Sequence, residues 1–385
     1  MPTLFLASVV VALFLAVATP AAQQGTSEIR GRVVDQTGAV LPGVTVVVTN
    51  EDSGVSRKTS SGADGSYFAT QLNPGRYRIL AKLSGFRSLE LTRLVLQLGR
   101  TLTINLPLEV GPHEETVTVP STTPLIDVAS TGVGGNIGTA ELTELPAMNR
   151  SFLATVALLP GLQLTPTNQL GNDTIVASGQ ASQNNNISVD GGYNIDDNSG
   201  ATFGVQVRTP LEAIQESQVL TSQYGAEHGR AGGAIVNVVT RQGTNTFRGV
   251  AFAHAAGDRL TAKNFFAKEG NLPEPQVTKR EWGFVAGGPI VRNKAHFFFS
   301  LERQVDKPIV TRVFSTRPSL NFSIAEDRTS WNTLLRFDNQ ITANHTWSIR
   351  WLREDAPQHH ITLFPYTTLF RSGLLHRRDE ELRAM

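Results

Sequence analysis

The chain has 385 residues, which is long enough for two or three domains. Its formal net charge is +1, from 34 lysines and arginines against 33 aspartates and glutamates, so the overall charge does not indicate a nucleic-acid partner. Charged residues make up 17% of the chain, below the roughly 25% of ordinary soluble domains. Because there is no cysteine, disulfide bridges, cysteine–zinc sites and thiol catalysis are excluded. This composition favours a β-rich exported protein.

The N-terminus has the pattern of a secretory signal peptide, predicted over residues 1–22. A run of apolar and small residues covers positions 4–17, which is the length of a signal-peptide core and too short to span a bilayer. Small residues predict cleavage after Ala18 or after Ala22. No lysine or arginine precedes the apolar run, which leaves open a natural start further upstream.

Residues 28–110 predict a compact all-β domain. From Val44 to Thr49 the residues follow the period of two that a half-buried strand requires. Turn residues recur between such runs, including Gly38, Gly65 and Gly75. Strands at this spacing predict a sandwich of about seven strands.

The same stretch resembles the carboxypeptidase regulatory-like domain, a transthyretin-like sandwich. The positions that carry the resemblance are Gly31, Val33, Asp35, Gly38, Leu41, Pro42, Gly43, Asp64, Gly65, Tyr67, Leu72, Pro74, Gly75, Tyr77, Gly85 and Phe86. Most of them are turn glycines, prolines and core aromatics, so they describe a scaffold and identify no catalytic or binding site. Members are described as carbohydrate-binding-like, but no exposed aromatic platform for sugar is visible in this sequence.

Residues 114–120 read Glu-Glu-Thr-Val-Thr-Val-Pro and follow the end of that domain. The alternation of threonine and valine predicts an extended segment, and Pro120 stops its pairing. By itself the segment is a short edge strand or a linker.

Residues 121–243 predict a mixed α/β domain. Apolar residues at 152, 153, 156 and 159 have the spacing of one helix face, so a helix is expected over 149–159, ended by Pro160 and Gly161. Residues 187–197 predict a strand, a glycine turn and a second extended piece. The β-branched run at 235–240 predicts a buried strand, and residues 241–245 predict a turn.

After residue 244 the pattern is that of an outer-membrane β-barrel. Trp331, Leu335 and Phe337 alternate with Asn332 and Arg336, and a second run around residues 347–351 does the same after a turn near residue 343. One face is therefore apolar and the other mainly polar, as expected for lipid-facing and lumen-facing sides with an aromatic girdle. A water-soluble sandwich would also alternate, but tryptophan and phenylalanine beside arginine favour the membrane.

Common catalytic and metal-binding motifs are missing from the sequence. There is no metalloprotease, P-loop or nucleophile-elbow motif, and basic residues form no aromatic-interleaved patch for nucleic acid. Residues 132–138 mimic a dinucleotide-binding loop, but the glycine spacing is wrong and we interpret the segment as a turn. Asp190, Asp196 and Asp197 lack the alternating spacing of a calcium loop. We therefore predict no enzyme activity, cofactor or metal.

Residues 361–385 are predicted to be an artefact. Residues 362–372 correspond, residue by residue, to the conceptual translation of a widely used sequencing adapter, so biological sequence is expected to stop near His360.

Signal peptide, regulatory-like sandwich, Thr/Val segment, plug-like domain and barrel start occur in the order that is typical of TonB-dependent outer-membrane receptors of the Oar-like group. The resemblance covers about residues 28–353, and the segment at 214–249 resembles the junction between plug and barrel. It implies a mainly β, multidomain fold: sandwich at 28–110, TonB box and plug at 113–243, and the start of a transmembrane β-barrel at 244–360. About 115 residues supply roughly six strands, whereas large receptor barrels have about 22, so the chain is expected to be a fragment that cannot transport by itself.

The resemblance also implies a function and a partner. It implies active uptake of a scarce solute across a bacterial outer membrane, with an extracellular ligand that the sequence does not identify and with outer-membrane lipid around the barrel. Glu115, Thr116, Val117, Thr118 and Val119 would form the TonB box, which adds as a strand to a sheet edge of TonB on the periplasmic side, where the sandwich would also lie. The main alternative is a surface protein for carbohydrate binding or adhesion, and an enzyme carrying the regulatory-like domain is a third.

Overall fold

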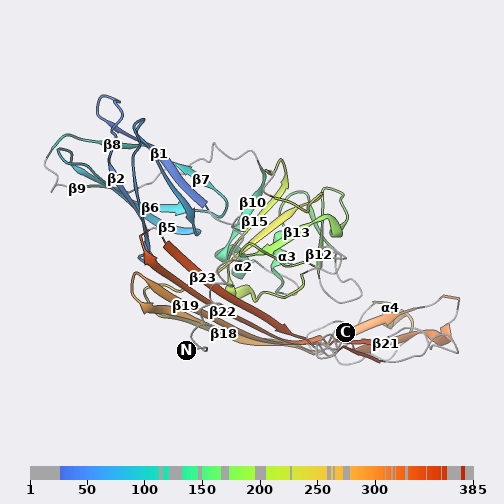
Figure 1. The fold of residues 1–385 in the computed structure, drawn as a ribbon. Coiled ribbons are helices and arrows are strands. Elements are labelled where there is room, and N and C mark those ends of the chain that lie inside the picture. The colour runs from blue at the N-terminus through green and yellow to red at the C-terminus, as the bar shows by residue number, and fades with distance from the viewer. Residues whose placement is uncertain are drawn as a thin grey trace, which may run out of the picture.

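The structure is a computed structural model with three parts that follow one another along the chain (Figure 1). The first part is a β-sandwich, the second is a mixed α/β unit, and the third is a sheet of long antiparallel strands. The predicted signal peptide and most of the predicted artefact tail lie outside the described residues. The described residues are 27–111, 116–120, 132–145, 150–165, 173–195, 205–225, 228–257, 262, 265–271, 278–307, 309–313, 315–316, 318–325, 328–343, 345–356, 358–361 and 374–377.

Two sheets form the sandwich. One has the strand order β4-β1-β7, with β8 also paired to β1, and the other has the order β3-β2-β5-β6-β9. The strand bounds are β1 (Ser27–Asp35), β2 (Thr45–Asn50), β3 (Ser56–Ser60), β4 (Ser66–Leu72), β5 (Gly75–Lys82), β6 (Ser88–Leu96), β7 (Thr101–Thr103), β8 (Leu106–Leu108) and β9 (Thr116–Pro120). One more strand than predicted arises from residues 27–108, because the short β7 and β8 pair in parallel with successive parts of β1.

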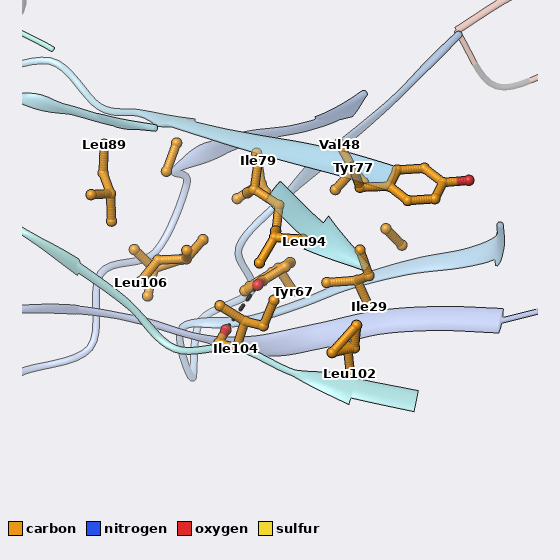
Figure 2. Packing of buried hydrophobic residues seen from close by; sticks show 14 of the residues in the cluster. Ile29, Val48, Tyr67, Tyr77, Ile79, Leu89, Leu94, Leu102, Ile104 and Leu106 are labelled. Atoms are coloured by element: carbon orange, nitrogen blue, oxygen red, sulfur yellow. Dashed lines mark hydrogen bonds between the residues drawn. The ribbon is translucent and has the colours of Figure 1, made fainter. Parts of the chain in front are cut away.

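The sandwich core is mainly aliphatic and lies between the two sheets (Figure 2). Tyr67 is 1% exposed, and its hydroxyl donates a hydrogen bond of 2.8 Å to the carbonyl oxygen of Ile104. Burial raises the pKa of Tyr67, so the phenol stays a hydrogen-bond donor. A Cβ at Gly31 would lie 1.8 Å from the same oxygen, which explains the requirement for glycine. Two residues that carry the sequence resemblance therefore surround one backbone carbonyl.

Replacing Tyr67 with phenylalanine is expected to lower the local unfolding free energy of the sandwich by about 1–2 kcal/mol, because the Ile104 carbonyl loses its donor. Hydrogen exchange of β1 and β4 amides in the whole chain measures this free energy. Phe68→Tyr is the matched control: Phe68 is the next residue and is 54% exposed, so a change of no more than about 0.5 kcal/mol is expected. Equal effects of the two substitutions would contradict the prediction.

The second part contains a five-stranded sheet with the order β10-β15-β16-β13-β14 and a separate β11-β12 pair. All six residues of β16 are buried, which confirms the predicted strand at 235–240. Asp190 and Gly191 have φ of 50° and 84° between β13 and β14, which confirms the predicted glycine turn. The element bounds are β10 (Val133–Gly138), β11 (Leu162–Thr165), β12 (Thr174–Ala177), β13 (Asn186–Val189), β14 (Gly192–Tyr193), β15 (Ile214–Ser222), β16 (Ile235–Thr240), α2 (Thr139–Glu144), α3 (Phe152–Val156), η1 (Ser182–Asn184) and η3 (Leu211–Ala213).

Two local predictions in this part were wrong. The helix expected over 149–159 is the shorter α3, because the N–H groups of Leu158 and Leu159 donate to carbonyls three residues back and tighten the chain into a turn. Residues 133–138, interpreted as part of a turn, form the edge strand β10, which pairs antiparallel with β15. A Cβ at Gly134 would lie 1.8 Å from the Val219 carbonyl oxygen, so glycine here permits a close approach of two strands.

The third part contains one large antiparallel sheet with the order β17-β18-β19-β22-β24-β25, with β23 also paired to β22, and a separate β20-β21 pair. Its longest strands, drawn in orange and red in Figure 1, lie beside the plug-like unit. The element bounds are β17 (Arg248–Gly257), β18 (Thr278–Val291), β19 (Ala295–Lys307), β20 (Ile309–Arg312), β21 (Phe322–Ala325), β22 (Arg328–Thr342), β23 (His345–Asp355), β24 (Gln358–Ile361), β25 (Leu374–Arg377), α4 (Phe265–Glu269) and η5 (Pro318–Leu320).

The faces of these long strands are inverted relative to a soluble sheet. Trp282 is 45% exposed whereas its neighbour Glu281 is 3% exposed, and on β22 Asn332 and Arg336 are buried while Phe337 is exposed. The exposed ring of Trp282 meets the partly buried ring of Trp331 edge to face at 5.3 Å. A polar inner face and an apolar, aromatic outer face are what a barrel wall in a bilayer presents. No helix within the described ranges is long and apolar enough to cross a membrane.

The junction between the second and third parts depends on Gly243. A Cβ at this residue would lie 2.3 Å from the carbonyl oxygen of Phe297 and 2.8 Å from that of Gly288. The chain therefore passes directly against the backbones of β18 and β19 as it leaves β16, and only a residue without a side chain fits there. This explains the glycine in the predicted turn at 241–245.

Candidate functional site

The predicted TonB box is an edge strand of the sandwich. Residues 116–120 form β9, which pairs in parallel with β6 from Ser88 opposite Thr116 to Thr92 opposite Pro120. Glu115, the first residue of the predicted box, lies outside the described residues. Of the two structural alternatives for this segment, edge strand and linker, the structure has the edge strand; its binding to TonB stays a prediction.

Asp190 links the second part of the chain, the plug-like unit, to the sheet of long strands in the third part, which we call the wall. Its carboxylate lies 3.1 Å from Nη1 of Arg350 and 3.7 Å from Nη1 of Arg336, which come from β23 and β22. The N–H and hydroxyl of Thr240, at the end of β16, donate to the same carboxylate at 2.9 and 2.6 Å. Asp190 and Arg336 are only 6% and 4% exposed at their side chains. One buried carboxylate therefore joins two plug strands to two wall strands.

Asp190 was weighed as a calcium ligand in the sequence, and its oxygens are instead directed at two guanidinium groups and Thr240. Asp196 and Asp197 lie outside the described residues. Within the part of the chain that the structure describes, no three His, Cys, Asp or Glu residues are grouped to hold a metal ion.

Arg150 makes a second ionic contact between the same two parts. Its guanidinium bonds Glu212 of η3, lies 3.3 Å from Glu281 of β18, and stacks over the ring of Phe252 at 5.1 Å. Arg208 adds a third contact, because its side chain bonds Gln304 and its N–H donates to Glu354 at 2.7 Å. Charged and polar groups thus mediate much of the contact between plug and wall. Such contacts are directional and can be exchanged for water, unlike a continuous apolar core.

The sandwich is joined to the plug by Glu216 of β15. Its carboxylate accepts hydrogen bonds from the N–H of Leu98, at 3.0 Å, and from the side-chain amide of Asn136, at 2.6 Å. The Asn136 amide also donates to the Leu98 carbonyl oxygen at 2.8 Å. Burial is the main cause that raises the pKa of Glu216, and the two hydrogen bonds oppose it. Leu98 lies two residues beyond β6, so the strand that holds β9 is itself tied to the plug.

The sandwich also touches the wall. Gln340 of β22 exchanges hydrogen bonds with the backbone of Ser56, at 2.6 and 3.4 Å, and the N–H of Asn245 donates to the Asp52 carbonyl oxygen at 2.8 Å. The sandwich is therefore bonded to both of the other parts, close to the junction at Gly243.

These contacts were largely missed by sequence reasoning. Arg150 lies in the predicted helix at 149–159 and Asp190 in the predicted strand and turn at 187–197, but neither pattern indicates a partner. The detectable signal was weaker: Arg336 stands on the polar face of an amphipathic strand, and Glu216 lies in a strand of mixed apolar and polar residues. An ionisable group on the inward face of a strand requires a partner, but its identity depends on the fold.

The comparisons with known proteins agree with this architecture. Residues 28–109 match the carboxypeptidase regulatory-like domain, and residues 239–324 match an outer membrane beta barrel domain. A curated relative, the TonB-dependent transporter Oar of Myxococcus xanthus, is 30% identical over 290 residues, which are 71% of this chain and 26% of that protein. The chain therefore spans about a quarter of the length of the relative it matches.

Solved structures with similar arrangements are more distant. The outer membrane transporter YddB of Escherichia coli is 12% identical with a TM-score of 0.48, and covers 60% of this chain and 34% of its own. The ferric enterobactin receptor of Pseudomonas aeruginosa, as an R480A/Q482A mutant, is 14% identical with a TM-score of 0.45, and covers 60% and 35%.

Fold and matched domains together define an outer-membrane protein, mainly β and multidomain, with a sandwich, a plug and part of a β-barrel. The chain belongs to the TonB-dependent receptors of the Oar-like group, and the curated relative that it matches is a transporter.

Proposed function

We propose that this chain is the energy-coupling end of an outer-membrane transporter that takes up a scarce solute. The sandwich and the TonB box face the periplasm, the plug occludes the barrel, and lipid surrounds the aromatic outer face. Residues 113–243 form box and plug, and residues 244–360 form part of a β-barrel. The sequence does not identify the extracellular ligand.

The position of β9 supports the proposal most directly. It is a short extended segment, and β-augmentation by a partner uses the backbone groups of such a segment. The plug strand that follows it in the chain is β10, which is also an edge strand, held on one side by β15. When TonB pulls on the box at residues 116–119, the force therefore acts first on the edge strand of the plug. An edge strand can be detached pair by pair, without breaking the buried β16.

Deletion of residues 115–119 from the full-length receptor tests the proposal. Energy-dependent uptake is expected to fall to the background of cells without the receptor, while ligand binding at the cell surface persists. Two single substitutions at Val117 separate the effect of the backbone from that of the side chain. Val117→Pro removes an N–H from the box and is expected to abolish uptake, whereas Val117→Thr keeps the backbone and the β-propensity and is expected to retain uptake within about twofold. Unchanged uptake after the deletion would contradict TonB-driven transport through this segment.

A further inference from the structure

The sandwich holds the candidate TonB box in its own sheet. β9 is the fifth and last strand of the β3-β2-β5-β6-β9 sheet, and its five residues pair one to one with residues 88–92 of β6. The two segments are separated by more than twenty residues of chain, so this pairing is a tertiary contact. Parallel pairing consumes the N–H and C=O groups along one edge of the box.

The strand β6, on which β9 docks, is itself anchored in the sandwich. Its other edge pairs antiparallel with β5, and Leu89, Leu94 and Leu96 are buried in the sandwich core. The edge of β6 that is open to pairing is also short. Arg93 has a φ of 61° and the β5–β6 register shifts there, so the regular edge of β6 ends where β9 ends, at Thr92 opposite Pro120. A five-residue strand on a regular edge can bind reversibly without disturbing the core beneath it.

We propose that the sandwich is a clamp for the TonB box: β6 and TonB compete for β9, and the box is withheld until it leaves the β6 edge. This rests on the proposed function, because it regulates the same segment. Removing β9 from the sheet breaks its backbone pairing with β6, which costs free energy. The docked box is therefore less available to TonB than a free peptide of the same sequence. The β6 strand ends two residues before Leu98, which is bonded to Glu216 and Asn136 of the plug. The clamp and the plug therefore share a strand.

A cysteine cross-link in the full-length receptor tests the clamp. The chain has no cysteine of its own. Glu90→Cys with Thr118→Cys places two thiols at directly paired positions, within the Cα separation that a disulfide requires. The matched control is Glu90→Cys with Thr116→Cys, which is out of register by two residues, so that the Cα atoms are about 8 Å apart, beyond disulfide range. Glu90 is in a partly exposed ion pair with Arg78, whose loss is expected to matter little.

Rapid cross-linking of the 90–118 pair under a mild oxidant, and not of the 90–116 pair, is expected. The purified periplasmic domain of TonB is then added before the oxidant. At a free concentration of about ten times its Kd, mass action predicts that the docked fraction, and with it the initial cross-linking rate, falls roughly tenfold. After cross-linking, binding of the TonB domain is expected to be lost and to return on reduction. The two single-cysteine variants, with binding equal to that of the unmodified receptor, establish that the substitutions themselves are tolerated.

Two results would overturn the clamp. One is equal cross-linking of both pairs or of neither, which means that β9 is not docked in this register. The other is a TonB domain that binds without slowing the 90–118 cross-link, which means that it adds to the open edge of β9. A receptor that cross-links as expected but never binds the TonB domain contradicts the proposed function instead.

Discussion

Replacing Asp190 with alanine is expected to loosen the plug from the barrel wall by about 2–3 kcal/mol, the range for losing hydrogen bonds to a charged group. The substitution removes the carboxylate that lies 3.1 Å from Arg350 and 3.7 Å from the almost fully buried Arg336, which keeps its ion pair of 2.8 Å with Asp338. It also removes the acceptor for the N–H and hydroxyl of Thr240. Faster hydrogen exchange of β13 and β16 amides in the full-length receptor measures the loss.

Two further variants test this prediction, one at Asp190 itself and one as a control. Asp190→Asn keeps an oxygen for the Thr240 N–H but removes the charge, so its effect is expected to lie between those of the native residue and alanine. Glu144→Ala removes an exposed carboxylate at the end of α2 in the same plug and is expected to change exchange by less than about 0.5 kcal/mol. If alanine at 190 behaves like alanine at 144, the Asp190 contact does not hold the plug.

Replacing Glu216 with leucine is expected to release the sandwich from the plug. Leucine leaves the buried Leu98 N–H and Asn136 amide without their acceptor, at about 1–3 kcal/mol for each orphaned group. Glu216→Gln keeps the accepting oxygen and is expected to hold the sandwich in place. Exchange of the Leu98 amide distinguishes the two variants, and an equal increase in both would show that charge, and not the accepting oxygen, is what matters.

The same contact is expected to depend on pH, with a sign opposite to that of an ordinary surface ion pair. Burial raises the pKa of Glu216 above its usual value of 4.5, so the docked state binds more protons than the released state above that pH. Docking therefore weakens as the pH rises from about 4.5 through the raised pKa, and is constant above it. Glu216→Gln should remove this slope. A slope that survives in the glutamine variant would assign it to another group.

Local pattern determined much of this protein from sequence alone. The alternation around Trp331 predicted which side of β22 is exposed, because strand residues point to opposite faces and lipid and lumen differ in polarity. The β-branched run of β16 predicted full burial for a similar reason. Motif order along the chain predicted the family, since each motif reports turns and core residues that are local. Where propensity and tertiary context compete, as at Gly134 and in α3, pattern reasoning failed.

Tertiary structure alone decided the contacts between the parts. Nothing in the sequence around Asp190 indicates that its partners lie 146 and 160 residues away, on Arg336 and Arg350. The Thr/Val segment at 116–120 reads as an extended strand, but its pairing with β6 depends on which sheet edge is open beside it. Strand propensity is a property of neighbouring residues, whereas the partner of a strand or a buried charge is set by the fold that brings distant groups together.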